Sequence, residues 1–231
     1  VSGVFDMKLR NGNNQNMENT IQVALLGLDF ASEGPLTKRH NSSYIFNYRY
    51  STTGILENAG IVDFGGILDY QDLNFKFNLP TRKAGTFSVW GTGLVDKSES
   101  EFEKDTEEWE YLGDQMESST KQYMAAGGIT HGYFFNDNTQ LKTTVAATYF
   151  RHEGFVDFYD FDLEKYPNLD LNRNNTNLIF STVLNRKFSA RFTSKTGFSF
   201  TKMYYDMEMN LSPHVMQPLE LISKGDGNTS L

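Results

Sequence analysis

The chain has no cysteine and no long apolar run. The missing cysteine excludes disulfides, thiolate metal sites and a cysteine nucleophile. The longest apolar run, Val23–Leu28, stops at Asp29. A membrane helix needs about 18–20 apolar residues, so helical membrane spans are excluded. A β-barrel is still allowed, because its strands need only about 9–11 residues of alternating character.

The chain has no excess of basic residues: 21 Lys and Arg stand against 29 Asp and Glu, and the net charge is −8. Nucleic-acid-binding surfaces are basic, so this balance argues against a nucleic-acid partner. Aromatic residues are plentiful instead, with 19 Phe and 12 Tyr among 231 residues. Since aromatic side chains favour strands, this composition favours a fold rich in β-structure.

Strict alternation of apolar and polar residues marks the stretch YQDLNFKFNLP, residues 70–80. One set of side chains is apolar and the interleaved set is polar: Leu73, Phe75, Phe77 and Leu79 against Asp72, Asn74, Lys76 and Asn78. This period predicts a β-strand with one apolar and one polar face. The apolar face must meet either a protein core or lipid, and the polar face either bulk water or a wet lumen.

The same rhythm recurs along the chain and predicts an all-β fold of about nine antiparallel, up-and-down strands. The predicted strands are Ser2–Leu9, Thr20–Ala31, Tyr44–Ser51, Tyr70–Pro80, Phe87–Val95, Tyr123–Ile129, Leu141–Phe150, Leu178–Leu184 and Arg191–Tyr204. The segment Thr20–Ala31 is compatible with one kinked strand or two short ones. The tail from Met207 onward is predicted to be irregular.

Connections after residue 80 alternate between short and long, with long loops predicted near 97–118 and 152–176. In an up-and-down sheet this puts the long loops at one end and the short turns at the other. Outer-membrane barrels have this asymmetry, so the pattern favours part of a large transmembrane β-barrel. Six tyrosines near strand ends fit an interfacial girdle: Tyr44, Tyr48, Tyr50, Tyr70, Tyr149 and Tyr204. The alternative is a soluble β-sandwich that binds a glycan or a protein.

Two blocks of sequence carry a family resemblance. SGVFDMKLRNGN (residues 2–13) resembles the last plug strand of TonB-dependent outer-membrane receptors, and LDFASEGPLTKRHNSSYIFNYRYS (residues 28–51) resembles their first barrel hairpin. The subgroup is the one with an N-terminal carboxypeptidase-regulatory-like domain. YQDLNFKFNLP is similar to the strand that follows in such receptors. The resemblance covers roughly the first 80 residues.

This resemblance implies that the chain is a fragment, with residues 1–16 forming the end of the plug and its linker, and residues 17–231 forming about eight barrel strands. It implies a segment of a receptor for TonB-dependent active uptake of a siderophore, oligosaccharide or peptide in a Gram-negative outer membrane. The implied partners are outer-membrane lipid, the nutrient, and the TonB complex through parts outside this chain. Strand parity adds a set of residues expected to face the lumen: Arg49, Asp72, Lys76, Lys142, Arg191 and Lys195.

The two predicted long loops combine aromatic and acidic residues, which suits capture of a sugar or peptide. The candidate ligand-binding residues are Trp109, Tyr111, Phe155, Phe158, Tyr159 and Phe161. Simpler interpretations are a solvated acidic loop for the first segment and packing of aromatic residues on the barrel rim for the second. The aspartates of the second segment could hold Ca²⁺, but they lack the order of an EF-hand loop.

No catalytic constellation is present in the sequence. The four histidines are scattered, without an HExxH motif, and no GxSxG elbow occurs. We therefore expect neither an enzyme nor a bound cofactor or metal.

Overall fold

A computed structural model describes residues 8–25, 27–37, 41–58, 60–61, 67–214 and 216–231. Its strands are β1 (Glu18–Ala24), β2 (Gly27–Thr37), β3 (Ser42–Ser51), β4 (Ile67–Pro80), β5 (Thr86–Ser100), β6 (Met116–Asn136), β7 (Thr139–Tyr159), β8 (Lys165–Lys187), β9 (Thr193–Leu211) and β10 (Glu220–Ser230). One short helix, α1 (Thr53–Asn58), follows β3, and two 3₁₀ turns, Thr106–Glu108 and Leu112–Gln115, lie between β5 and β6. None of the helices in the described residues is long and apolar enough to cross a membrane.

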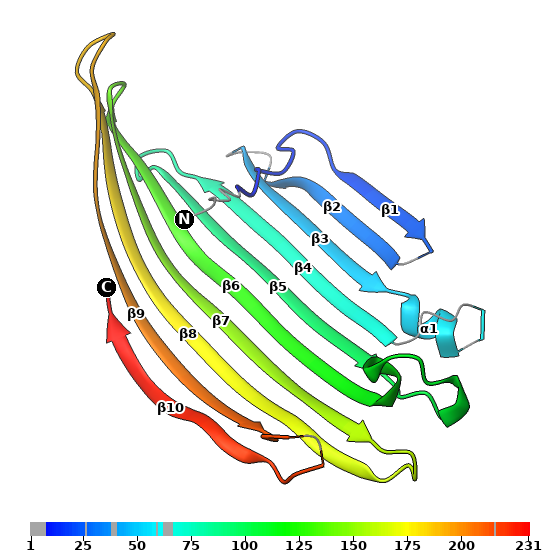
Figure 1. The fold of residues 1–231 in the computed structure, drawn as a ribbon. Coiled ribbons are helices and arrows are strands. Elements are labelled where there is room, and N and C mark those ends of the chain that lie inside the picture. The colour runs from blue at the N-terminus through cyan, green and yellow to red at the C-terminus, as the bar shows by residue number, and fades with distance from the viewer. Residues whose placement is uncertain (1–7, 26, 38–40, 59, 62–66, 215) are drawn as a thin grey trace.

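The ten strands form a single antiparallel sheet in chain order, from β1 to β10. Figure 1 shows them side by side and tilted, with β1 and β10 at opposite edges of the sheet. The predicted all-β, up-and-down antiparallel fold is therefore confirmed. The sheet is not closed.

Three local predictions of secondary structure are corrected. The predicted loop 152–176 is wrong, because β7 and β8 run through it and leave only residues 160–164 as a turn. The predicted irregular tail is wrong as well, because β9 continues to Leu211 and β10 pairs with it. Both regions are rich in polar and aromatic residues. Backbone hydrogen bonds to the neighbouring strands define these strands, although the sequence has no regular alternation of apolar and polar residues there. The segment Thr20–Ala31 is divided between two strands, β1 and β2, which pair as a hairpin.

The connections divide between two ends of the sheet. One end, the turn end, holds the connections 38–41, 81–85, 137–138 and 188–192. The other, the loop end, holds 25–26, 52–66, 101–115, 160–164 and 212–219. The two longest connections lie at the loop end, and the loop predicted near 97–118 is confirmed between residues 101 and 115.

Register places many of the large apolar side chains on one side of the sheet, here called the apolar face. A continuous row crosses six strands through directly paired residues, namely Phe77, Val89, Ile129, Val145, Phe180 and Phe200. Val145 is 58% exposed and Phe200 42%. The described strands form only one sheet, so no second sheet covers this row.

On β6, a tyrosine marks each limit of this apolar region. Tyr123 and Tyr133 lie on the apolar face, ten residues apart. At about 3.4 Å per residue this is about 34 Å along the strand. If the strands were tilted by about 40°, as in outer-membrane barrels, this length would correspond to a height of about 26 Å, and the apolar band of such barrels is about 25 Å tall. We call the region between these tyrosines the apolar band.

The predicted tyrosine girdle is only partly reproduced. Tyr48, Tyr149 and Tyr204 fall on one row of the apolar face, connected by direct pairings across the intervening strands. Tyr70 pairs with Asp96 on the opposite face, so its assignment to the girdle is wrong.

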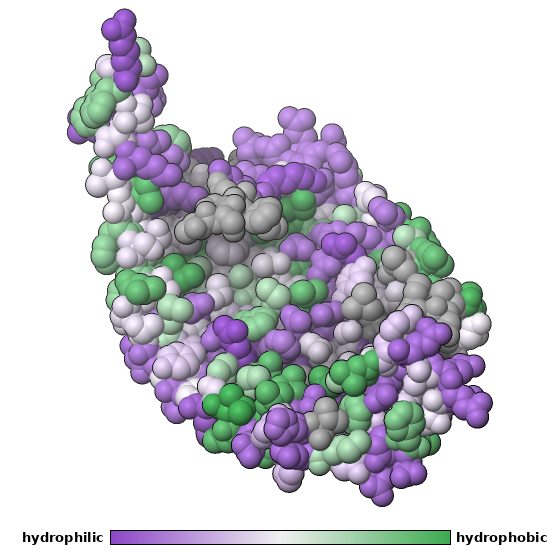
Figure 2. Space-filling view, in the orientation of Figure 1, coloured by the Kyte–Doolittle hydropathy of each residue, from purple (hydrophilic) through white to green (hydrophobic). Residues whose placement is uncertain are grey.

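The opposite side of the sheet, the polar face, carries a chain of hydrogen bonds between strands. Asn47 donates to Asp29 at 2.6 Å, and Thr92 donates to Asn74 at 2.7 Å. Residues 8–16 run in irregular conformation over this face, where the Lys76 ammonium donates to the Leu9 carbonyl at 2.8 Å. Figure 2 shows this face, on which hydrophilic residues are spread among pale and hydrophobic ones. The predicted plug strand Ser2–Leu9 lies mostly outside the described residues, and residues 8 and 9 are not in a strand.

The sheet has almost no conventional core. Among the described residues, the buried hydrophobic side chains are Ala146 and Phe158. The accessible surface is 15804 Å² for a mass of 26.4 kDa. A compact monomer of this mass exposes roughly 10,600 Å², so this sheet exposes about half as much again. A sheet of this kind needs a further partner, either lipid or protein, for its apolar face.

Candidate functional site at the loop end

The candidate site is formed where the loop 101–115 meets the β7–β8 hairpin. The rings of Phe102 and Tyr159 stack with centroids 3.7 Å apart, and Trp109 lies 5.1 Å from Phe161. With Phe155, these residues form what we call the loop-end aromatic cluster. Segments about 50 residues apart in sequence thus build one surface beyond the apolar band.

The acidic residues of loop 101–115 fold the loop locally. Asp105 accepts a hydrogen bond from the Glu107 amide at 3.0 Å and so caps the first 3₁₀ turn. The Asp114 carboxylate accepts from the amides of Glu110 and Tyr111. Such side-chain acceptors replace the missing ladder partners of a loop backbone. The loop is therefore held by its own carboxylates, in addition to their role in solvation.

A similar device forms the β7–β8 turn. The Asp160 carboxylate accepts from the amides of Asp162 and Glu164, at 2.9 and 3.0 Å. Leu163 has a φ of 60°, in the left-handed region that costs a residue with a Cβ about 1–2 kcal/mol. The turn projects Phe161, which is 73% exposed, beyond the end of the sheet.

Lys165 joins the two carboxylates beneath the aromatic cluster. Its ammonium lies 2.7 Å from Asp157 Oδ2 and 3.2 Å from Glu117 Oε2. It also lies 5.7 Å from the Phe155 ring centroid and 5.9 Å from that of Tyr159, within the range of cation–π attraction. One cation thus fixes strands β6, β7 and β8 relative to one another.

These contacts shift the ionisation of the site. Hydrogen bonding to Asp157 raises the pKa of the Lys165 ammonium, and hydrogen bonds from Tyr159 and Lys165 lower the pKa of the Glu117 carboxyl. Burial and the Glu117 contact raise the pKa of Tyr159. Hydrogen bonding to Glu164 and burial raise the pKa of Tyr166 to about 12. At neutral pH the site therefore holds a charged Lys165, an ionised Glu117 and neutral phenols.

The structure brings together four of the six predicted ligand-binding residues, which are Trp109, Phe155, Tyr159 and Phe161. Tyr111 is 71% exposed on the same loop. Phe158 is only 5% exposed, so its assignment to a ligand surface is corrected: the side chain is buried, and the residue lies in β7 opposite Met116 and Tyr166.

The sequence predicts no role for Lys165 or Glu117. Lys165 falls in the predicted loop 152–176, and a loop has no pairing partners from which its neighbours could be inferred. A single lysine among four nearby carboxylates was the available signal.

Five of the six residues predicted to face a lumen do share the polar face by register. These are Arg49, Asp72, Lys76, Lys142 and Lys195. Arg49 and Asp72 form an ion pair at 2.8 Å. Arg191 is corrected, because it lies in the β8–β9 turn, where Ser189 Oγ accepts from its amide. A hydroxyl acceptor of this kind favours a turn over continuation of the strand.

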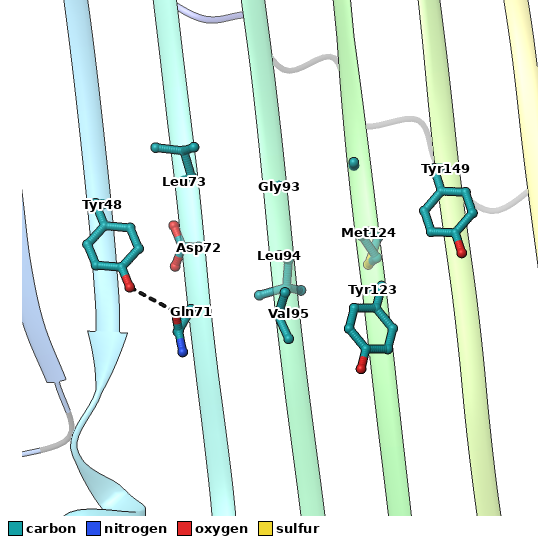
Figure 3. Close-up of a pocket in the computed structure, with 11 residues that line it drawn as sticks. Tyr48, Gln71, Asp72, Leu73, Gly93, Leu94, Val95, Tyr123, Met124 and Tyr149 are labelled. Carbon is teal, nitrogen blue, oxygen red and sulfur yellow. Dashed lines mark hydrogen bonds between the residues drawn. The ribbon is translucent and has the colours of Figure 1, made fainter.

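A shallow hollow of about 400 Å³ lies on the apolar face, toward the loop end. Figure 3 shows its lining, with small residues such as Gly93 between the rings of Tyr48, Tyr123 and Tyr149. Tyr48 donates its hydroxyl proton to Gln71 at 2.8 Å at one edge of the hollow. The hollow arises because Gly93 and Ala125 occupy the positions where neighbouring strands carry large side chains.

Within the described residues, no group of three or more His, Asp or Glu side chains could hold a metal ion. Comparison of the chain with protein-family models, curated proteins and solved structures finds no match.

Proposed function

We propose that this chain is a segment of a TonB-dependent receptor barrel in a Gram-negative outer membrane. The observation that carries the proposal is the exposed row of apolar side chains that crosses six strands on one face of a single sheet. Its central residues Val145 and Ile129 are 58% and 52% exposed. Hydrophobic burial drives folding in water, and a soluble chain of this size leaves few such rows uncovered. Lipid supplies the missing partner for this face.

The polar face supports a wet lumen that contains chain. Arg10 pairs with Glu33 at 2.5 Å, and the Asn13 amide donates to the same carboxylate at 2.7 Å. Gly12 lies so close to β3 that a Cβ there would be 1.8 Å from the Tyr44 carbonyl oxygen. A segment held this tightly on the polar face fits the end of a plug domain entering its barrel.

The loop end then faces the outside of the cell, and the loop-end aromatic cluster takes part in nutrient capture. Exposed rings beside carboxylates suit a sugar ring or a peptide, because both present CH groups and hydrogen-bond donors. The receptor would move such a nutrient inward through energy supplied by the TonB complex.

A soluble β-sandwich that binds a glycan or protein is the other candidate. A sandwich requires a second sheet against the apolar face. The described strands all belong to one sheet, so this observation favours the barrel.

The test is topology in intact cells, with the natural protein that contains this chain. An epitope inserted after Glu108, in loop 101–115, should bind antibody on intact cells. The same epitope after Lys83, in turn 81–85, should bind only after the outer membrane is permeabilised. Recovery of the protein in the soluble fraction, or equal labelling at both positions, would contradict the proposal. Nutrient uptake should then be compared between strains with and without TonB, using iron–siderophore, oligosaccharide and peptide supplies.

A further inference from the structure

Charged residues are divided unequally between the two faces of strands β6 to β9. By register, the carboxylates of these strands lie on the apolar face, and they are Glu117, Glu153, Asp157, Asp170, Asp206 and Glu208. The polar face of the same strands carries four cations and no carboxylate, and the cations are Lys142, Arg173, Lys187 and Lys195. This part of the polar face, here called the cationic wall, therefore has a formal charge of +4 on a chain whose total is −8.

The other part of the polar face, on β1 to β5, has the opposite charge. Its carboxylates are Glu18, Asp29, Glu33, Asp72 and Asp96, and its cations are Arg49 and Lys76. Residues 8–16 lie over this acidic part, where Arg10 forms an ion pair with Glu33. Since a cation of the covering segment meets a carboxylate there, charge complementarity predicts an anionic occupant for the cationic wall.

Arg173 is the cation of the wall that lies closest to the loop end. Its guanidinium carbon lies 5.9 Å from the centroid of the Phe150 ring. With the Asn175 amide turned so that its oxygen faces the guanidinium, that oxygen accepts from Nε and Nη2 at 3.1 and 3.3 Å. Both partners are neutral, so they orient the planar guanidinium without cancelling its charge.

Carboxylates of the polar face lie far from Arg173. Among the described residues its guanidinium makes no ion pair, and its direct neighbours across the strands are His152 and Met207. Asp96 lies three strands away along the same paired row, about 14 Å at about 4.8 Å per strand. Glu220, at the start of β10, is two strands away and four residues further along. The guanidinium therefore keeps its full charge for a ligand.

The wall beside this cation has apolar groups and open space. Phe150 and Tyr205 flank Asn175 from the two neighbouring strands. Met207 pairs on its other side with Gly225, where an added Cβ would have no atom within 4 Å. Rings, a thioether and free space next to one cation suit an anion that has a larger neutral body.

We infer that the cationic wall binds a nutrient with one or two carboxylates on a larger neutral body, and that Arg173 contacts a carboxylate. The inference rests on the proposed function, which makes the polar face the lumen of a receptor. A guanidinium binds a carboxylate through two parallel charge-assisted hydrogen bonds. A polyanion is disfavoured, because loop 101–115 carries seven carboxylates and one lysine and would repel it at the loop end. An acidic oligosaccharide and a peptide with a free C-terminus both have the required chemistry.

The test is calorimetric binding of two matched pairs of probes to the full-length protein in mild detergent. One pair is an N-acetylated tetra-alanine peptide with a C-terminal carboxylate or carboxamide, and the other is a trisaccharide that ends in glucuronic acid or glucose. The wild type should bind the carboxylate member of one pair about tenfold more tightly than the neutral member, which distinguishes a peptide from a sugar. Arg173→Gln should abolish most of this preference, and Arg173→Lys should keep part of it because it keeps the charge.

Met207→Glu is a second test variant, because it places a carboxylate directly opposite Arg173 and should also abolish the preference. Arg186→Gln is the matched control on the same strand: Arg186 lies on the apolar face, opposite Thr139, and its replacement should leave the preference unchanged. Equal binding of both members of each pair by the wild type would overturn the inference. So would an unchanged preference in both test variants.

An acidic face of the plug is the other possible occupant of the wall. It would give equal binding of the paired probes together with a lower midpoint of thermal unfolding for Arg173→Gln, and this result would also overturn the inference. Surface labelling at the two epitope positions separates the two proposals. If the epitopes are labelled as expected but the probes bind equally, only the inference about the nutrient fails. Labelling that contradicts the expected topology rejects the proposed function itself.

Discussion

Replacing Val145 with arginine tests what the apolar face contacts. Val145 lies at the centre of the apolar row, between Ile129 and Phe180, and is 58% exposed. If this face met water, an arginine there would change the free energy of unfolding by about 0.5 kcal/mol or less, as at ordinary surface positions. At the middle of a bilayer the same side chain costs about 2–4 kcal/mol on a barrel's lipid face. The bilayer cost alone corresponds to a factor of about 30 to 900 in the folding equilibrium constant, against a factor of about 2 for the change in water.

The assay is urea-dependent folding of the full-length protein into phosphatidylcholine vesicles, read by the electrophoretic shift of the folded barrel. Ser181→Arg is the matched control: Ser181 follows Phe180 on β8 and points to the polar face, opposite Thr144. The Val145→Arg variant should lose about 2–4 kcal/mol and the control much less, because the control charge stays in a wet environment. Equal losses in the two variants would refute a lipid contact for this face.

Three further outcomes follow from close contacts and charges. Gly128→Ala should destabilise the sheet by about 1–3 kcal/mol, because the new Cβ would lie 2.5 Å from the backbone oxygen of Val145. Gly93→Ala should be nearly neutral, because the nearest atom to its Cβ would be 3.7 Å away. Urea titration of the two variants measures the difference in the free energy of unfolding. Lys165→Met should lower the free energy of unfolding by about 1 kcal/mol and weaken nutrient binding, since it removes the ion pairs of Asp157 and Glu117. Thermal unfolding and uptake assays measure the two effects. An unchanged midpoint of thermal unfolding would contradict the role given to this cation. The lowered pKa of Glu117 means that its stabilising contribution is complete above the pKa of the unfolded chain and is lost as the pH falls through its lower folded value. Emission from Trp109 should thus be constant near neutrality and change on acidification below about pH 4.5, and a change confined to alkaline pH would contradict this assignment.

Alternation alone was enough to predict the central strands. In β4 the apolar residues repeat without interruption from Leu73 to Leu79, so the face on which each residue lies follows directly. Period-2 patterning is reliable here because most of the large side chains on this side of β4 and its neighbours are apolar within the band. The same reasoning placed Lys76 on the polar face with its neighbours.

Prediction failed where strands leave the apolar band. The first half of β8, from Lys165 to Thr176, pairs with β7 although it contains few apolar residues. Outside the band both faces of a strand meet water, so hydrophobic alternation is no longer required. Backbone pairing then decides the structure, and pairing depends on the neighbouring strand, which a local pattern does not contain.

The candidate site could be predicted only in part for the same reason. The sequence indicates the aromatic residues of both segments, but it does not show that the two segments meet. Because β7 and β8 continue past the band, the hairpin reaches the loop 101–115 and stacks Tyr159 on Phe102. The same extension brings Lys165 between Asp157 and Glu117, and these contacts cross three strands. The length of the strands beyond the apolar band therefore determines whether the aromatic residues act as one surface, and that length is set by cross-strand pairing.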